Sequence, residues 1–297
     1  MRIRVSIPAQ TLELREDDGR LLRRFSVSTA KNGPGEQRGS NRTPRGRHIV
    51  RAKIGAGQPE NTVFVRRRPT GETWSPEFAA ANPGRDWILT RILWLSGKEP
   101  GFNRGGEVDT MRRYIYLHGS PDVADMGVPG SIGCVRMRNR DIAELFDLVP
   151  AYTPVDIVEF GLETGAWEVL GEAAQAIRET VFVREQKVPA ELELDEFDAG
   201  SLHAVARGPA GEAIGTGRLL ADGHIGRMAV LPEWRGKGAG RALLETLMDA
   251  ARESGMPRLA LNAQTTATGF YARLGFAAKG EIFMDAGIPH VRMTRTA

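Results

Sequence analysis

A cysteine and a histidine are the residues of this 297-residue sequence with the clearest potential for covalent chemistry. Cys134 is the only cysteine and follows Gly133 on a predicted tight turn, before a helix expected to start near Asp141. A thiol with its ordinary pKa of about 8.5 needs a nearby base before it can act as a nucleophile at neutral pH. His118 ends a predicted strand and could supply that base. We therefore expect Cys134 to be a nucleophile activated by His118. The alternative, a small buried residue, fits most lone cysteines.

A second stretch, residues 228–240, has the composition of a phosphate-binding turn. A predicted strand runs into a glycine-rich turn, and the helix that follows has one apolar face and stops at Gly255. The free N–H groups and the positive dipole end at the start of such a helix suit a pyrophosphate. The dinucleotide fingerprint fails because Arg241 stands where its third glycine should be. A Walker loop fails because Lys237 is followed by glycine.

Length and composition indicate two ordinary globular domains. Domains usually hold about 100–200 residues, and the apolar and charged fractions of 41% and 26% are unremarkable for a globular chain. One cysteine excludes an intramolecular disulfide and a cysteine-based zinc cluster, and we expect no metal site. Residues 1–160 hold 25 Lys+Arg against 19 Asp+Glu, and the remainder holds 15 against 18. This modestly basic first half favours small anionic substrates but lacks the features of a nucleic-acid-binding protein.

The start of the chain goes directly into strand-like alternation and has no apolar run of signal-peptide length. No window approaches the roughly 18 apolar residues of a membrane-spanning helix. We therefore expect a cytoplasmic protein without a membrane span. The alternative is the periplasm or cell envelope, reached by another export route. The oligomeric state stays open.

Alternating apolar and polar residues predict that the first half is mostly β. Strands are predicted near residues 3–7, 12–14, 22–27, 49–52, 62–66, 87–95, 112–118 and 153–160, with one helix over 141–149. In the strand over 112–118, Tyr114, Tyr116 and His118 share one face. Gly119 is expected to break that strand and to leave His118 at its exposed end.

Three motifs in this half resemble the L,D-transpeptidase catalytic domain of the YkuD type, over residues 1–160. They are Thr43-Pro44-x-Gly46, Tyr116-Leu117-His118-Gly119 and Ser131-x-Gly133-Cys134-x-Arg136, in that order. The resemblance implies a mainly-β domain that performs acyl transfer on peptidoglycan stem peptides without a cofactor. His118 would take the proton from Cys134, and the thiolate would attack the carbonyl before a D-alanine. The acyl group would then pass to an amine in transpeptidation or to water in carboxypeptidation.

Other residues near the pair are candidates for oxyanion or substrate contacts. Backbone N–H groups at Gly133 and Cys134 could form part of an oxyanion hole, since glycine permits an unusual turn. Arg136 could bind a substrate carboxylate, brace the loop or simply be exposed, and Tyr116 could line the site or pack in the core. The predicted oxyanion and substrate residues are Gly133, Ser131, Arg136, Gly119 and Tyr116. The family often has a second histidine where this chain has Ile132, so that role is vacant or moved.

In the second half, residues 161–165 are predicted to be a linker. A strand over 167–170 and a helix over 172–185 follow, then strands over 202–206, 213–219, 224–230 and 258–263, and a helical stripe over 267–274. An acidic segment, residues 191–198, could hold a cationic amine through Glu191, Glu193 or Asp195. A solvated loop is the plainer interpretation of it.

The Arg-x-x-Gly-x-Gly pattern of residues 235–240, with the strand and helix downstream, resembles the GCN5-related N-acetyltransferases (GNAT) over residues 166–297. The resemblance implies an α/β (α+β) domain with a central mixed sheet, in which acetyl-CoA lies in a splay beside the strand at 228–230. Tyr271 would protonate the departing thiolate, and an amine would accept the acetyl group. No general base is evident, and His224 and His290 are candidates that more simply are structural. The implied cofactor contacts are Met228, Ala229, Val230, Arg235, Gly236, Lys237, Gly238, Ala239, Gly240 and Asn262.

Together these patterns predict a bifunctional acyltransferase with domains at 1–160 and 166–297. The first would be a cysteine-dependent L,D-transpeptidase or L,D-carboxypeptidase acting on peptidoglycan stem peptides, and the second would transfer acetyl from acetyl-CoA to an amine. Wall cross-linking takes place outside the cytoplasm, whereas acetyl-CoA is inside it. We therefore expect the first domain to trim or exchange D-amino acids on soluble muropeptides or precursors. In the alternative, motivated by Ile132, only the acetyltransferase reacts and the first domain is a muropeptide-binding module.

Overall fold

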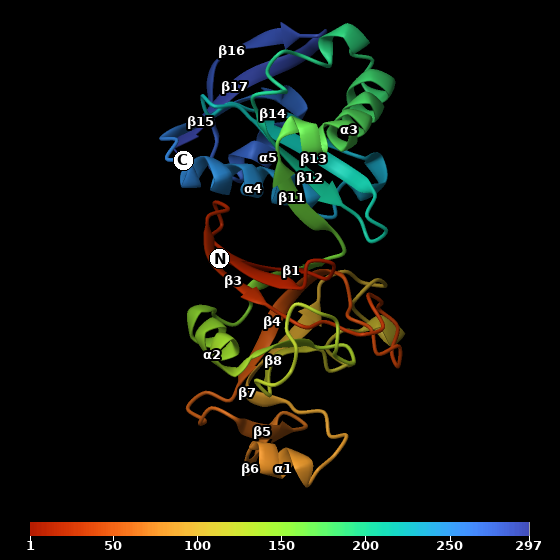
Figure 1. Cartoon of the computed structure of the whole chain (residues 1–297), viewed down its shortest axis with the longest axis vertical. Helices are drawn as coiled ribbons and strands as arrows, with labels where there is room; N and C mark the ends of the chain where they lie inside the picture. Colours follow the sequence, from red (N-terminus) through yellow and green to blue (C-terminus); the bar gives the residue numbers. More distant parts are fainter. Residues whose placement is uncertain (297) are drawn as a thin grey trace. The chain divides into compact units, whose positions relative to one another are not determined.

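The computed structural model describes residues 1–296 and divides the chain into two compact units. Residues 1–15 and 22–159 form the first unit, and residues 16–21 with the chain from Phe160 onward form the second. The first unit is mainly β and the second combines helices with sheets, which confirms the predicted fold classes (Figure 1).

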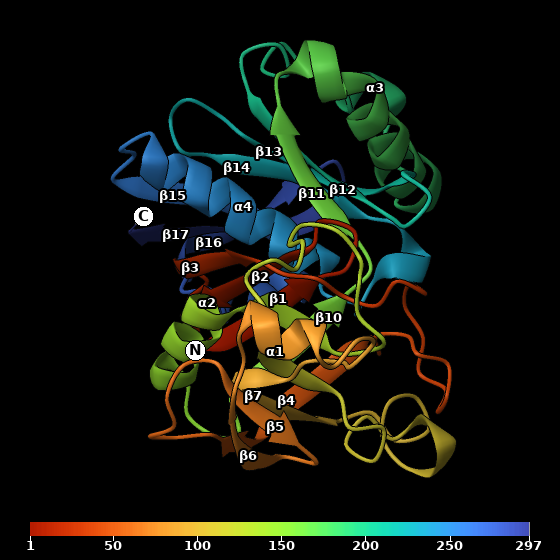
Figure 2. The same cartoon turned by 60° about the horizontal axis from the view of Figure 1, so that its bottom comes forward.

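The first unit is built on a ten-stranded sheet with the strand order β3-β2-β1-β10-β4-β7-β5-β6, and β8 pairs with both β7 and β9. Figure 2 brings the end that carries α1 toward the viewer. Its elements are β1 (Arg2–Ser6), β2 (Thr11–Arg15), β3 (Leu21–Ser26), β4 (Gly46–Ile54), β5 (Thr62–Val65), β6 (Arg68–Thr73), α1 (Pro76–Ala80), β7 (Leu89–Gly97), the 3-10 turn η1 (Gly106–Val108), β8 (Tyr116–Ser120), β9 (Val135–Arg138), α2 (Asn139–Leu148) and β10 (Pro154–Val158).

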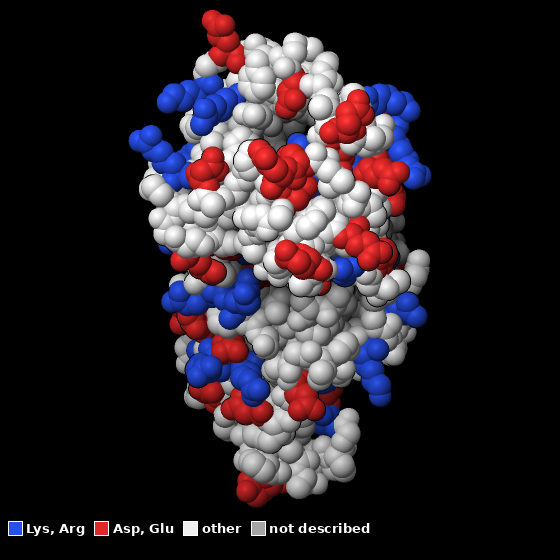
Figure 3. Space-filling model, turned by 45° about the horizontal axis from the view of Figure 1, so that its top comes forward, with Lys and Arg blue, Asp and Glu red and all other residues white. Residues whose placement is uncertain are grey.

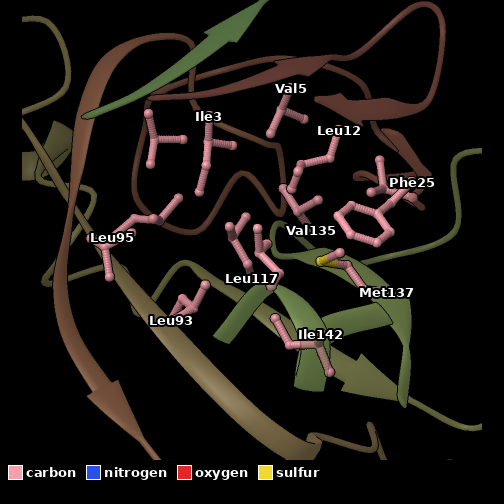
Figure 4. Packing of buried hydrophobic residues seen from close by; sticks show 14 of the residues in the cluster. Ile3, Val5, Leu12, Phe25, Leu93, Leu95, Leu117, Val135, Met137 and Ile142 are labelled. Atoms are coloured by element: carbon pink, nitrogen blue, oxygen red, sulfur yellow. The ribbon is translucent and has the colours of Figure 1, made fainter. Parts of the chain in front are cut away.

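The main hydrophobic core of this unit lies between the sheet and α2. Leu117 of β8 and Val135 and Met137 of β9 point into it, and Ile142 of α2 closes it from the other side (Figure 4). Leu117 and Val135 are fully buried. Burying side chains of this size contributes about 1.5–3 kcal/mol each, so this core pins the register of β8 and β9.

The predicted strand over 112–118 is wrong in its bounds. The backbone N–H of Tyr114 donates to the carbonyl of Met111, Tyr114 has a φ of 60°, and the Asp109 carboxylate accepts the N–H of Arg112. These local hydrogen bonds make residues 111–114 a turn, because they satisfy backbone groups that a strand would leave to a neighbour. The strand begins only at Tyr116.

Gly119 does not break the strand, and His118 is not exposed. β8 continues to Ser120, and His118 has 1% of its surface accessible. A Cβ on Gly119 would lie 2.5 Å from Asn139 Oδ1 and 2.7 Å from the carbonyl oxygen of Leu89. The glycine is therefore required by close packing within the sheet rather than by a strand end.

The second unit contains a four-stranded sheet, β11-β12-β13-β14, and a three-stranded sheet, β15-β17-β16. Its elements are β11 (Gly161–Gly165), α3 (Trp167–Arg178), the π-helical η2 (Glu179–Glu185), η3 (Ala190–Leu192), β12 (Leu202–Arg207), β13 (Ala213–Leu219), β14 (Ile225–Val230), η4 (Pro232–Trp234), α4 (Ala239–Glu253), β15 (Arg258–Gln264), η5 (Thr265–Ala267), α5 (Thr268–Ala272), β16 (Ala277–Asp285) and β17 (Ile288–Thr296).

Helices α3 and α4 cover opposite faces of the four-stranded sheet. Val205 of β12 packs with Leu170 of α3, whereas Gly215 of β13 lies against Leu243 of α4. Val205 pairs with Thr216, so Gly215 points to the other face. Within residues 1–296 the two sheets meet through a single parallel bridge, between His224 and Ala260, which accounts for the predicted mixed character of the sheet.

Two predictions for the start of this unit are wrong. Residues 161–165 are not a linker, because they form β11, which pairs antiparallel with β12. Residues 167–170 are not a strand, because α3 begins at Trp167 and ends at Arg178, where the π-helical η2 continues it. Leu170, Ala174 and Ile177 are all buried, and their spacing places them on one helical stripe that a strand would split between two faces.

The surface carries no single-sign charge patch on the face that Figure 3 shows, where acidic and basic side chains are interspersed. Within residues 1–296, no helix is long and apolar enough to cross a membrane. The same residues contain no group of three or more His, Cys, Asp or Glu side chains that could hold a metal ion.

The buried imidazole of His48 predicts a loss of stability in acid. Burial lowers the pKa of His48 from 6.5 to about 4, while its Nδ1–H donates to the carbonyl of Gly46. Below pH 6.5 the His48 imidazole is protonated in the unfolded chain but stays neutral in the folded chain until about pH 4. The free energy of unfolding therefore falls by about 3 kcal/mol by pH 4. Urea unfolding of the wild type and His48→Gln at pH 7 and pH 4.5 checks this. Equal losses in the two proteins contradict it.

Candidate active sites

Cys134 lies on the turn that leads into β9, and the turn has a conformation that favours glycine. Gly133 has a φ of +132°, and a Cβ there would lie 3.1 Å from Ile115 Cδ1. The buried Thr43 hydroxyl donates to the carbonyl of Gly133 at 3.0 Å. The threonine of the first motif therefore anchors the turn of the third.

Ser131 closes this turn with two hydrogen bonds. Its hydroxyl donates to the carbonyl of Cys134 at 2.5 Å and accepts the backbone N–H of Gly133 at 3.2 Å. The Gly133 N–H is therefore engaged. The N–H of Cys134 donates no hydrogen bond within residues 1–296. It remains the backbone donor of this turn that is available to an oxyanion.

The Cys134 thiol is packed among apolar groups. The backbone N–H of Tyr116 donates to Sγ at 3.4 Å, and the thiol faces the carbonyl of Tyr114 at 3.5 Å. Burial raises the pKa of Cys134 to about 12, and the Tyr116 N–H offsets only part of this. The resting group at neutral pH is therefore the thiol and not the thiolate.

His118 lies on the same face of the sheet as Cys134. In the parallel pair β8–β9, His118 is opposite Arg136, and Cys134 precedes Arg136 by two residues. The Nδ1–H of His118 donates to the carbonyl of Gly119 at 2.8 Å, which leaves Nε2 as an acceptor. Burial lowers the pKa of His118, so the imidazole is neutral at rest.

Arg136 braces the site through an ion pair. Its guanidinium bonds to Asp86 at 2.6 Å and donates to the carbonyl of Gly130 at 3.0 Å. Asp86 raises and Arg136 lowers the pKa values of both His118 and Cys134, so one ion pair acts on both groups. Its role is closer to the predicted brace than to a free carboxylate receptor.

Tyr116 and Ile132, two positions near Cys134, differ in burial and in hydrogen bonding. The Tyr116 hydroxyl accepts a hydrogen bond from Arg67 at 3.1 Å, and its ring packs edge-on against Trp94. Ile132 is 58% exposed. The position of the second family histidine therefore faces solvent, and an isoleucine there supplies no acid, base or hydrogen bond.

In the second unit, the glycine-rich turn leaves open space at the start of α4. Gly236 and Gly238 have φ values of +75° and +93°, and no atom lies within 4 Å of where their Cβ atoms would be. A Cβ on Gly240 would lie 3.6 Å from Val230 Cγ2. Ala242 is the first residue after Gly238 whose N–H closes a helical turn, so the N–H groups before it are available to an anion.

The two cations of this turn differ in availability. The Arg235 guanidinium forms a bidentate pair with Glu185 at 2.7 and 2.6 Å and donates to the carbonyl of Val230. It therefore fastens the turn to η2. Lys237 Nζ lies 4.7 Å from the ring of Trp234 and forms no ion pair within residues 1–296. Lys237 is the charge that a pyrophosphate can recruit.

Strands β14 and β15 separate beyond their bridge. Past His224, no bridge within the described chain joins Met228, Ala229 and Val230 to β15. On its other edge, β14 has an irregular register against β13 near Arg227, whose φ is 51°. Backbone groups of residues 228–230 on that side are left without strand partners. Asn262 is an exposed residue of β15, and His290 donates to the carbonyl of Ile288.

Tyr271 has a phenol that keeps its proton. Burial raises its pKa to about 12, and its ring packs against Phe270 and Phe276. The hydroxyl has no hydrogen-bond partner among residues 1–296. It is therefore free to donate to an atom of a bound molecule.

Comparison with known families matches both halves. Residues 1–157 match the L,D-transpeptidase catalytic domain family, and residues 166–297 match the acetyltransferase (GNAT) domain family. The chain belongs to the L,D-transpeptidase family and also carries a GNAT domain. GNAT domains use acyl-CoA in general.

Three individual proteins are each similar to one half of the chain. The uncharacterized N-acetyltransferase YjcF of Bacillus subtilis is 41% identical over 123 residues, which cover 40% of this chain and 87% of YjcF. An acyl-CoA N-acyltransferase from Pseudomonas aeruginosa is 30% identical, with a TM-score of 0.43 over 46% of this chain and 99% of its own. An L,D-transpeptidase from Mycobacterium smegmatis is 19% identical, with a TM-score of 0.33 over 52% of this chain and 57% of its own.

The L,D-transpeptidase domain contains an element that the sequence did not predict. Arg67, in the turn between β5 and β6, lies 4.6 Å from the ring centroids of both Trp94 and Tyr114. Arg66 and Arg67 both have positive φ, a backbone conformation that costs free energy in residues other than glycine. The run of three arginines was the available signal, but such runs are usually solvated.

Three carboxylates of the acidic segment of the GNAT domain are held in ion pairs. Buried Arg178 binds Glu193 and Asp198, while Asp195 pairs with Arg218 and Arg227. Burial acts to raise the pKa of Asp195, but the two arginines outweigh it and hold the pKa below its usual value. Carboxylates held in this way are poor bases, whereas Glu191 and Glu196 are exposed and form no ion pair within residues 1–296.

A neutral, partly exposed thiol predicts slow alkylation. Because the pKa of Cys134 is raised to about 12, its reaction with iodoacetamide should accelerate about tenfold per pH unit up to pH 10. In urea the rate should level off near pH 8.5–9, the range of an ordinary thiol. Intact-mass analysis measures this cleanly, since Cys134→Ser leaves no cysteine. A plateau below pH 8 in the folded protein overturns the prediction.

Proposed function

We propose that this chain is a bifunctional acyltransferase. Its first domain acts as a cysteine-dependent L,D-transpeptidase or L,D-carboxypeptidase on peptidoglycan stem peptides, and its second transfers acetyl from acetyl-CoA to an amine. The observation that carries the first half is the placement of Cys134 and His118 on one face of the β8–β9 pair, under one Asp86–Arg136 ion pair. Family membership supports the reaction class.

The proposed chemistry starts from a neutral pair. As Sγ of Cys134 attacks the substrate carbonyl, Nε2 of His118 takes the thiol proton, so a free thiolate need not accumulate. The carbonyl of Gly119 accepts the Nδ1–H of the imidazolium and stabilises its charge. The Cys134 N–H donates to the developing oxyanion. The C–N bond then breaks, the leaving D-alanine takes the proton from Nε2, and an amine or water resolves the thioester.

The proposed substrates are soluble muropeptides or stem-peptide precursors, and the proposed location is the cytoplasm. Supply of acetyl-CoA supports this location, because the GNAT domain on the same chain uses an acyl-CoA. Trimming or exchange of D-amino acids fits such substrates better than cross-linking of the assembled wall.

In the second domain, the residues present suit acetyl-CoA. The open backbone at Gly236 and Gly238 would take the pyrophosphate, and Lys237 would add a positive charge. The edge of β14 at residues 228–230 that β15 does not pair with, and Asn262, would face the pantetheine arm. The bound group supplies an activated acyl carbon. The Tyr271 hydroxyl holds the proton that the departing sulfur takes up.

Release of D-alanine tests the first activity. A tetrapeptide stem incubated with the full chain should lose its terminal D-alanine, measured by mass spectrometry. Cys134→Ser should abolish the release, and His118→Gln should lower kcat by about 10²–10⁴-fold because the general base is lost. His290→Gln, a histidine exchange in the other domain, serves as the matched control and should change kcat less than twofold.

Covalent labelling separates an enzyme from a binding module. A carbapenem should add its mass to the wild type and not to Cys134→Ser. Peptide binding without D-alanine release and without an adduct refutes catalysis by the first domain and supports the muropeptide-binding alternative.

The open backbone at Gly236 and Gly238, which we call the glycine cradle, predicts a specific loss of cofactor affinity when a side chain is added. Gly236→Ala should raise the KM for acetyl-CoA at least tenfold, because a Cβ fills space that a phosphate would approach. Gly255→Ala is the matched control, since Gly255 has a similar φ of +71° at the other end of α4 with no atom near its Cβ position. Initial rates against a panel of amines measure both. Equal effects would assign the loss to backbone strain.

A further inference from the structure

The L,D-transpeptidase domain has a second concave site away from Cys134. A cavity of about 300 Å³ opens where β4 and β7 meet the loop between β7 and β8. Ile49, Ser96 and Met111 form its less polar lining. We call it the basic pocket, because its other lining side chains are Arg51, Lys98, Arg104, Arg112 and Asp109.

The basic pocket lies on the same sheet face as the nucleophile. Ile49 pairs with Ser96, and Ser96 is two residues from Trp94 on β7, so both point to one face. Trp94 pairs with Tyr116, whose backbone N–H touches the Cys134 sulfur. Three strand spacings, about 15 Å, therefore separate the pocket from Cys134 across one continuous face.

Its cations form no ion pairs within residues 1–296, although Arg112, against the effect of burial, contributes to lowering the pKa of Asp109. Lys98, Arg104 and Arg112 form no ion pair within residues 1–296, and Arg51 contacts only the hydroxyl and ring of Tyr152. Asp109 is the one acid in the lining, and its oxygens accept the backbone N–H groups of Gly105 at 2.8 Å and Arg112 at 3.0 Å. The lining therefore combines four positive charges with one negative charge.

The loop that carries these cations is held in place before any ligand arrives. Asn103 Nδ2 donates to the carbonyls of Arg45 and Arg47, and the Thr110 hydroxyl donates to the carbonyl of Asn103. A Cβ on Gly97 would lie 2.1 Å from the carbonyl oxygen of Asn103, so loop and sheet are in tight contact. A preformed site loses little conformational entropy on binding.

We propose that the basic pocket binds a phosphate or diphosphate group. A single carboxylate would leave most of the charge uncompensated, whereas a phosphate dianion or a diphosphate matches it. Guanidinium groups also bind phosphate oxygens in a bidentate fashion. The phosphate belongs either to a separate small molecule or to the peptide substrate itself. The second source rests on the proposed function. Four or five extended residues span about 15 Å, so a peptide cleaved at Cys134 could reach the pocket with its other end.

Pyrophosphate titration of the full chain tests the pocket directly. With ¹³C-methyl-labelled methionine, the NMR signal of Met111 should shift and saturate. In Arg104→Gln/Arg112→Gln the midpoint should rise at least tenfold. Arg140→Gln, on a side chain that is 86% exposed outside the pocket, should stay within twofold of wild type. Met228 reports separately on the glycine cradle. A Met111 signal that does not move, or equal midpoints in all three proteins, overturns the proposal.

A second measurement identifies the source of the phosphate. D-Alanine release is compared for a tetrapeptide that is extended at its amino-terminal end by two residues, with and without a phosphate on that end, so that five residues separate the phosphate from the cleaved bond. If the phosphate is part of the substrate, it should lower the KM at least tenfold in wild type. That preference should vanish in the double variant, with kcat on the unmodified peptide within twofold. An equal KM together with a normal Met111 response assigns the pocket to a separate phosphorylated molecule. If no D-alanine is released at all, the proposed function fails, while the Met111 titration still decides the pocket.

Discussion

The parallel pairing of β8 with β9 is the constraint on which the first site depends. Leu117 and Val135 are opposite each other and bury their side chains in the core, so the alternate residues His118 and Cys134 must face the other side. A slip of one residue would place the nucleophile in the core and a leucine in the site. The hydrophobic effect, acting on residues that take no part in the chemistry, therefore fixes the position of His118 and of the strand that directly follows Cys134.

Burial has the opposite chemical effect on the two partners. It raises the pKa of the Cys134 thiol and lowers that of the His118 imidazole, and both changes favour the neutral forms. The resting site is therefore a protected thiol beside a base that is ready to accept a proton. In the GNAT domain, the groups available to a ligand are backbone N–H and C=O groups, and their availability has a different origin. In the part of the chain that the structure describes, its two sheets share one bridge, at His224 and Ala260, and then diverge, so backbone groups on that side have no strand partner.

Charge pairing distinguishes structural cations from available ones. Arg136, Arg178 and Arg235 all form ion pairs with carboxylates, and each one joins a loop or turn to a neighbouring strand or helix. The cations of the basic pocket and Lys237 lack such partners within residues 1–296. Cations without partners can gain more from an incoming anion, because no existing ion pair must be broken.

The sequence alone was enough to identify the two families and the order of the domains, because motif spacing and alternation are local properties of the chain. It also predicted the nucleophile and its base, most strands, and the helix after Gly240. Only the tertiary structure decided that Gly119 is a packing glycine, that His118 is buried and that residues 161–165 pair with β12. Asp86, Arg67 and the basic pocket likewise come from segments far apart in the chain. Their roles depend on long-range packing and ion pairing, which no local pattern encodes.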